Sequence, residues 1–167
     1  MNRILNLILI AAATVLLPGC VTYEREWRLW NPPPAKESRN FYSKSEPPPT
    51  PQSSFDGRWL GRWTSDRHRK PFSSEMEGGE LRCIFTRIDP YRYRANFRAE
   101  WMLGASTYLT QLYGKQRGNT LHLHGQDQVS RIFGGIYTYD GKVTPNHFTL
   151  RYDSSYDSGT FEMRKLR

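Results

Sequence analysis

Residues 91–101, which read YRYRANFRAEW, give the clearest structural signal in this chain. Apolar and polar side chains alternate strictly over these eleven residues. Successive side chains of a β-strand point to opposite faces of the sheet, whereas a helix repeats every ~3.6 residues. The alternation therefore predicts an antiparallel strand that is buried on one face only. The apolar face would carry Tyr91, Tyr93, Ala95, Phe97, Ala99 and Trp101, and the polar face Arg92, Arg94, Asn96, Arg98 and Glu100.

Seven further segments of this kind follow residue 55, and turn sequences separate several of them. Asp140-Gly141, residues 117–119 and Asp89-Pro90 are typical of tight connections between strands. An open sheet of this size would leave two exposed edges, which closure into a barrel removes. We therefore predict an all-β domain over residues 55–167: an eight-stranded antiparallel up-and-down barrel, with a β-sandwich as the alternative. The seven segments are residues 57–64, 79–87, 107–114, 119–125, 134–139, 146–152 and 159–166.

The N-terminal residues have the layout of an export signal. Arg3 precedes a short apolar run, residues 4–17, which is below the ~20 residues that a membrane-spanning helix needs. The run leads into Leu17-Pro18-Gly19-Cys20, which resembles the lipobox of bacterial lipoproteins. That resemblance implies a signal peptide over residues 1–19 and acylation of Cys20 by fatty acids such as palmitate. Because Val21 rather than Asp follows, it also implies an outer-membrane or other cell-envelope location.

Residues 20–54 are predicted to be the lipidated cysteine followed by a disordered, proline-rich tether. Two proline runs, residues 32–34 and 47–51, favour extended polyproline II backbone. Near the start of this tether, Tyr23, Trp27 and Trp30 would share one face of a helix. Aromatic side chains with nearby cations favour the membrane–water boundary, so these three are predicted to contact the bilayer surface.

The first predicted strand of the domain resembles a calycin motif. Residues 55–63, FDGRWLGRW, are similar to the Gly-x-Trp opening strand of the lipocalins, fatty-acid-binding proteins and avidins. The resemblance implies a barrel closed by a basic residue of the last strand packed on the first-strand tryptophan. Here those residues would be Arg164 and Trp59.

Candidate ligand-binding residues come from the apolar face already described. In a wide barrel, aromatic side chains of this face would line a pocket for an apolar ligand. In a narrow barrel they would be core. The candidates are Trp59, Tyr91, Tyr93, Phe97 and Trp101.

No catalytic site, cofactor site or metal site is predicted. His122 and His124 share one strand face, but a third ligand is not identifiable by spacing. Asp153 and Asp157 flank a polar turn, which is the simpler interpretation than a catalytic carboxylate pair. Cys83 would be a buried, inert thiol, with a reactive thiol as the alternative.

The charge and the export signal together narrow the function. A net charge of +8 would suggest nucleic acid for a cytosolic protein, but export argues against that partner. We expect a non-enzymatic, lipid-anchored envelope protein whose barrel binds a small apolar ligand or an envelope macromolecule. One alternative is an inhibitor that blocks a hydrolase through a loop such as residues 65–78, and another is a purely structural lipoprotein.

Overall fold

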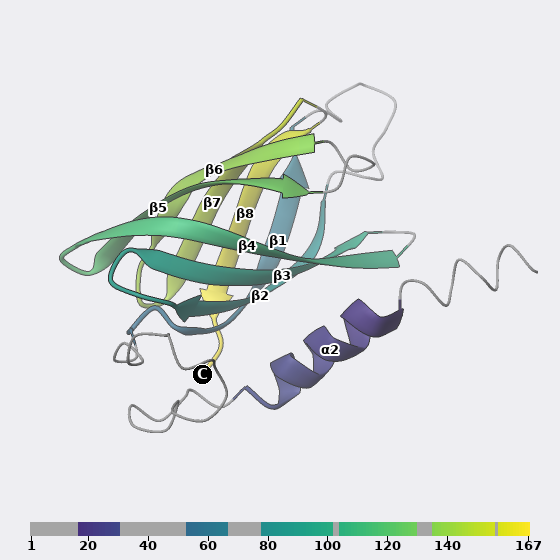
Figure 1. Ribbon diagram of the computed structural model, residues 1–167, viewed down its shortest axis with the longest axis horizontal. Helices are drawn as coiled ribbons and strands as arrows, with labels where there is room; N and C mark the ends of the chain where they lie inside the picture. The colour runs from purple at the N-terminus through teal and green to yellow at the C-terminus, as the bar shows by residue number, and fades with distance from the viewer. Residues whose placement is uncertain (1–16, 31–52, 67–77, 102–103, 130–134, 156) are drawn as a thin grey trace, which may run out of the picture.

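The described residues form a closed eight-stranded barrel with a helix packed outside it (Figure 1). The computed structural model describes residues 17–30, 53–66, 78–101, 104–129, 135–155 and 157–167. Each strand pairs antiparallel with the next, and the first pairs with the last, so the up-and-down barrel is confirmed over the sandwich. The elements are α2 (Leu17–Arg28), β1 (Gly57–Ser65), β2 (Gly78–Arg87), β3 (Arg92–Trp101), β4 (Gly104–Arg117), β5 (Thr120–Val129), β6 (Gly135–Val143), β7 (His147–Asp153) and β8 (Ser158–Lys165).

Strand β3 has the predicted sidedness, with one exception at its start. Tyr93, Ala95 and Phe97 are buried in the barrel, and the residues between them face outward. Tyr91 was expected on the inward face, but its side chain is 69% exposed. The reason is that Tyr91 belongs to the turn before β3, where the Asp89 carboxylate accepts hydrogen bonds from the backbone N–H groups of Tyr91 and Arg92. Strand alternation does not extend into that turn.

The turn between β4 and β5 was predicted correctly, whereas another expected turn is part of a strand. Gly118 separates β4 from β5 with a φ of +59°, in the left-handed region that glycine adopts without strain. Asp140-Gly141 instead lies inside β6. Gly141 is there because the neighbouring strand approaches closely: a Cβ atom at this position would lie 2.2 Å from the backbone oxygen of Thr149.

The seam between β1 and β8 closes the barrel, and it depends on two glycines. A Cβ atom on Gly61 would lie 1.9 Å from the backbone oxygen of Glu162, and one on Gly159 would lie 1.9 Å from that of Thr64. Both distances are far below van der Waals contact. The two strands can therefore pair only where these inward positions carry no side chain.

Trp59 lies at the closed end of the barrel, beneath a lysine rather than the expected arginine. The Nζ atom of Lys165 lies 5.7 Å from the Trp59 ring centroid and donates a 2.6 Å hydrogen bond to the Ser54 carbonyl. Arg164 is exposed. Phe161, Met163 and Lys165 share the inward face of β8, and Arg164 lies on the outward face. The basic residue that faces Trp59 is therefore Lys165.

Aromatic rings fill the closed end of the barrel. The Phe148 ring lies 5.6 Å from Trp59 and 5.2 Å from Phe85, centroid to centroid, and Phe85 stacks on Tyr93 at 5.2 Å.

Burial raises the pKa of the Cys83 thiol in β2 well above its usual value, as expected for an inert thiol.

The close approach of the two strands at Gly61 gives the first prediction. Gly61→Ala should lower the free energy of unfolding by about 2–3 kcal/mol, because the added methyl group must push β1 and β8 apart. Urea denaturation followed by tryptophan fluorescence measures this change. Gly125→Ala is the control: its Cβ would first meet the flexible end of Leu112, at 2.6 Å, so a smaller loss is expected. Equal losses would contradict the role of the seam.

Candidate functional site

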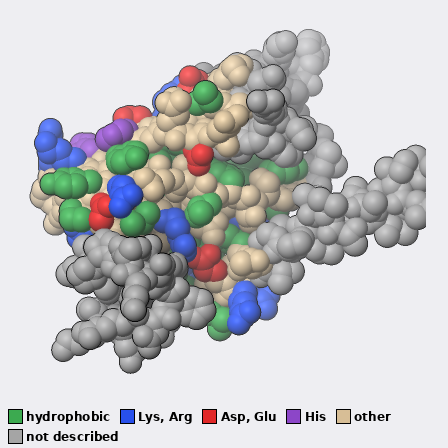
Figure 2. All heavy atoms as spheres, in the orientation of Figure 1, with side chains coloured by type: hydrophobic (Ala, Val, Ile, Leu, Met, Phe, Trp, Pro, Cys, Tyr) green, Lys and Arg blue, Asp and Glu red, His purple; other side chains and the backbone are tan. Residues whose placement is uncertain are grey.

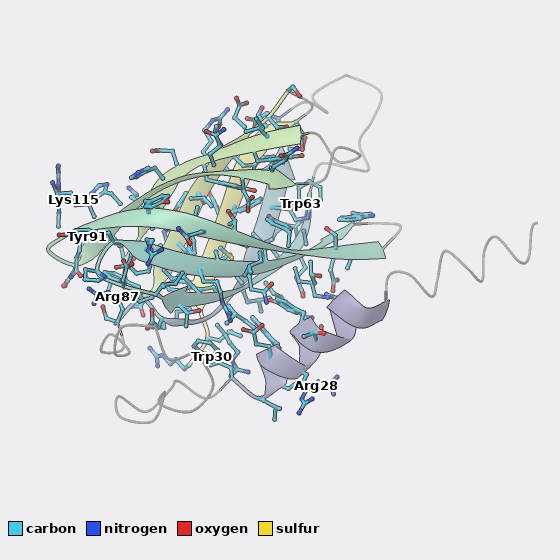
Figure 3. The ribbon with its side chains drawn as sticks, viewed as in Figure 1. Arg28, Trp30, Trp63, Arg87, Tyr91 and Lys115 are labelled. Atoms are coloured by element: carbon cyan, nitrogen blue, oxygen red, sulfur yellow. The ribbon has the colours of Figure 1, made fainter. Side chains whose placement is uncertain are left out.

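The half of the barrel opposite Trp59 contains a partly open cavity of about 480 Å³. Its volume falls within the ~300–1,000 Å³ range of small-molecule sites. It lies at the end of the barrel where β1 and β3 finish and β4 and β8 begin, the end at which Figure 3 labels Trp63. Its lining residues are Trp63, Ala99, Trp101, Ser106, Thr107, Tyr108, Leu109, Asp127, Gln128, Tyr137, Tyr139, Tyr152, Asp157 and Phe161.

The cavity exists because small residues occupy inward positions at this end. Ala99 of β3 pairs with Ser106 of β4, and Gly159 of β8 faces inward nearby. The closed end has Trp59 and Phe148 at the corresponding inward positions. Since eight strands fix the barrel's width, small inward residues leave volume that large ones would fill.

Aromatic rings form one continuous wall of the cavity. Tyr137 stacks on Tyr139 with centroids 6.4 Å apart and lies 6.1 Å from Tyr152, whose ring is 4.9 Å from Phe161. On the opposite strands, Tyr108 stacks on Phe97 at 5.2 Å. On β1, the Trp63 indole N–H donates a 2.8 Å hydrogen bond to the Glu100 carbonyl, which fixes that ring at the cavity edge.

Two carboxylates are the charged groups among the described lining residues. Asp157 accepts hydrogen bonds from the Ser65 hydroxyl at 2.5 Å and the Tyr152 hydroxyl at 2.9 Å. Asp127 lies on β5 and accepts a 2.7 Å hydrogen bond from the backbone N–H of Gln128. Among the residues that the structure describes, neither carboxylate forms a salt bridge.

The candidate ligand residues occupy three different places. Trp59, Tyr93 and Phe97 are buried in the core, on the side of the cavity toward the closed end. Trp101 lines the cavity. Tyr91 is exposed at the other end of the barrel from Trp63 (Figure 3).

Most of the lining residues were not among the candidates, because the candidates came only from the first and third predicted strands. Continuing the same period-two pattern along β4, β6, β7 and β8 places five further aromatic residues on inward positions. These are Tyr108, Tyr137, Tyr139, Tyr152 and Phe161.

Burial keeps several cavity phenols neutral. Desolvation raises the pKa of Tyr108 and Tyr139 well above the usual value, and the Asp157 carboxylate contributes to the same rise at Tyr152. These three hydroxyls therefore remain protonated at neutral pH and cannot serve as bases there.

The raised pKa values of the cavity tyrosines predict that the protein loses stability at alkaline pH. Above about pH 10 the unfolded chain loses phenolic protons that the folded chain retains, so the free energy of unfolding should fall as pH rises. Urea denaturation at several pH values measures the fall, and ultraviolet difference spectroscopy follows the phenols. Tyr108→Phe should make the fall shallower, whereas Tyr91→Phe, at an exposed site, should leave it unchanged. An unchanged slope in Tyr108→Phe would contradict burial of that phenol.

Outside the barrel, α2 covers an apolar patch on β2. Tyr23 of the helix is 2% exposed, and Ile84, which faces outward from β2, is fully buried although it is not part of the barrel core. Ile84 pairs with Arg58 on one side and Asn96 on the other, and both of these contact the helix. Figure 1 shows α2 running beside β2.

Ion pairs join the helix to the arginines of β2 and β3. Glu24 lies 3.2 Å from Arg82 and 3.4 Å from Arg98, and Glu26 lies 2.6 Å from Arg94. The side chains of Arg58 and Arg82 also lie over the Trp27 ring, 5.7 and 5.8 Å from its centroid.

The helix changes the interpretation of two predicted features. The predicted tether begins with a helix that is docked on the barrel, and Tyr23, expected at the bilayer surface, is buried under it, stacked on Trp27 at 6.0 Å. Trp27 is bound by arginines, whereas Trp30 is half-buried beyond the end of the helix (Figure 3). The helical spacing of Tyr23 and Trp27 was correct, but an aromatic face of this kind fits a protein surface as well as a membrane.

The ion pairs predict how firmly α2 is held. In Glu24→Gln/Glu26→Gln, the amides of residues 22–28 should exchange hydrogen about fivefold faster, because partly exposed pairs contribute about 1 kcal/mol together. Hydrogen exchange with mass spectrometry measures this. Glu162→Gln, an exposed position on β8, is the control, and exchange in the barrel strands should stay unchanged in both variants. Unaltered exchange in residues 22–28 would contradict docking by these pairs.

Other candidate sites are dispersed. His122 and His124 are exposed, and histidine side chains are visible at the molecular surface in Figure 2. Across the described ranges, no three His, Cys, Asp or Glu side chains are grouped to hold a metal ion. Asp153 is exposed while Asp157 lines the cavity.

Of the loop at residues 65–78, positions 67–77 lie outside the described residues, as do residues 1–16 of the predicted signal peptide and 31–52 of the tether. In the part of the chain that is described, no helix has both the length and the apolar character to cross a membrane.

Comparison with known proteins gives one structural likeness. No family model matches the chain, and no curated protein matches it. Among solved structures, the chain is similar to a redesigned β-barrel, with 13% sequence identity and a TM-score of 0.48 over 68% of this chain and 92% of that one.

Proposed function

We propose that this protein is a lipid-anchored, non-enzymatic binding protein of the cell envelope, which holds a small, largely apolar molecule in its barrel. The observation that carries the proposal is the cavity of about 480 Å³. Its aromatic walls offer an apolar ligand both burial and ring contacts.

The chemistry of the lining favours binding over catalysis. The Asp157 carboxylate is already occupied by two hydroxyl groups, and the cavity tyrosines stay protonated at neutral pH. A general base or a nucleophile needs a group that is free to exchange a proton near the working pH. Apart from the single carboxylate of Asp127, the described lining therefore supplies shape and polarity rather than reactive groups.

The proposed anchor at Cys20 would set the orientation of the barrel. Along α2, Glu24 meets Arg98 near the cavity end, whereas Trp27 meets Arg58 at the closed end. The helix therefore runs from the cavity end toward the closed end, and Cys20, about 6 Å before Glu24, lies on the cavity side. Acyl chains on Cys20 would hold that end of the barrel toward the bilayer, which suits a ligand that is taken from lipid.

Filling the cavity tests the proposal. The neutral fluorescent probe N-phenyl-1-naphthylamine should bind the full chain, and Ser106→Phe should weaken its binding by at least about tenfold, because the added ring projects into the cavity. Fluorescence titration measures the affinity, and circular dichroism checks that the variant is folded.

The neighbouring residue provides a matched control. Ala105→Phe places the same ring on the outward face of β4 and should leave the probe's affinity unchanged. Native mass spectrometry of protein extracted from membranes should also detect a bound small molecule. Absence of probe binding, or equal binding by Ser106→Phe and the unaltered chain, would overturn the proposal.

A further inference from the structure

We infer that the molecule held in the cavity is an organic cation, a protonated or quaternary amine on an apolar body. This inference rests on the proposed binding function and adds the charge of the ligand to it. It comes from a contrast between the cavity and the rest of the molecule.

The charge of the described lining is opposite to that of the chain. The chain carries a net charge of +8, yet the described lining residues include two carboxylates, Asp127 and Asp157, and no Lys, Arg or His. Lys165, a basic residue that faces inward, lies at the closed end over Trp59. A ligand in the cavity thus meets negative charge from both carboxylates.

Asp127 is the carboxylate that is best placed to meet a ligand. It follows Leu121, Leu123 and Gly125 on the inward positions of β5 and pairs across the sheet with Tyr137. Its Oδ1 atom accepts the hydrogen bond from Gln128, and among the described residues no donor is found for its Oδ2 atom. A carboxylate in a walled cavity without a paired cation attracts a positive ligand more strongly than one in open solvent.

The aromatic walls provide the second element of a cation site. The faces of tryptophan and tyrosine attract ammonium groups, and several such rings around one space are typical of sites for quaternary ammonium ligands. Trp63, Trp101 and Tyr137 line this cavity together with Asp127. The barrel already uses the same interaction at its other end, where Lys165 lies 5.7 Å from the centroid of Trp59.

The same lining disfavours the other ligand classes. A fatty acid or a phosphate would bring negative charge beside Asp127 and Asp157 with no described countercharge. A neutral hydrocarbon would use the aromatic walls but would leave the Asp127 carboxylate partly desolvated without a countercharge, at a cost in binding free energy.

An isosteric pair of ligands tests the charge separately from the cavity. Benzyltrimethylammonium and neopentylbenzene have the same shape and differ in one positive charge. Each is titrated against the full chain by displacement of N-phenyl-1-naphthylamine. The cation should lose about tenfold in affinity in Asp127→Asn, whereas the neutral compound should bind that variant at least as well as it binds the unaltered chain.

The controls separate this inference from the proposed function. Asp140→Asn removes an exposed carboxylate from the outer face of β6 and should change neither affinity. Asparagine at 127 keeps an oxygen for the Gln128 N–H, so the local backbone is retained. If both compounds displace the probe but Asp127→Asn weakens neither, the ligand charge is wrong and the binding function stands. If the probe itself does not bind, both proposals fall.

Discussion

Pairing of the first strand with the last is the constraint on which the structure depends. Without the β1–β8 hydrogen bonds the sheet would have two exposed edges and an unclosed apolar face. The seam is narrow enough that Gly61 and Gly159 must lack side chains, and Lys165 covers Trp59 where the seam reaches the closed end. Closure therefore depends on three local conditions that lie far apart in the sequence.

Closure also explains why a small barrel can be filled at one end and hollow at the other. The number of strands and their stagger fix the width, so the size of the inward side chains decides the remaining volume. Trp59, Phe85 and Phe148 fill one end, whereas Ala99 and Ser106 leave the cavity at the other. The filled end supplies stability through apolar burial, and the hollow end gives up some of that burial for a binding site.

The outer surface shows how charge and apolar contact are combined. The arginines of β2 and β3 receive Glu24 and Glu26 from α2, and beneath them Tyr23 and Ile84 are removed from water. Partly exposed ion pairs contribute little energy by themselves, but they fix how the helix lies on the sheet. The described basic surface is therefore partly neutralised by the chain itself, while the described cavity lining remains acidic.

The sequence by itself determined the fold class and the sidedness of its best strand, because alternation is a local property of extended backbone. Tyr93 and Phe97 were placed inside from their spacing alone, and the same spacing, carried through the other strands, would have placed Tyr108 and Tyr152 inside as well. Only the tertiary structure decided what these positions mean. Whether an inward residue is core or cavity lining depends on the residues opposite it across the barrel, and those are set by the register of all eight strands. Likewise, the helical spacing of Tyr23 and Trp27 indicates that one face of this segment contacts a surface, but it does not say which surface. Only the packing in three dimensions shows that the surface is the chain's own barrel.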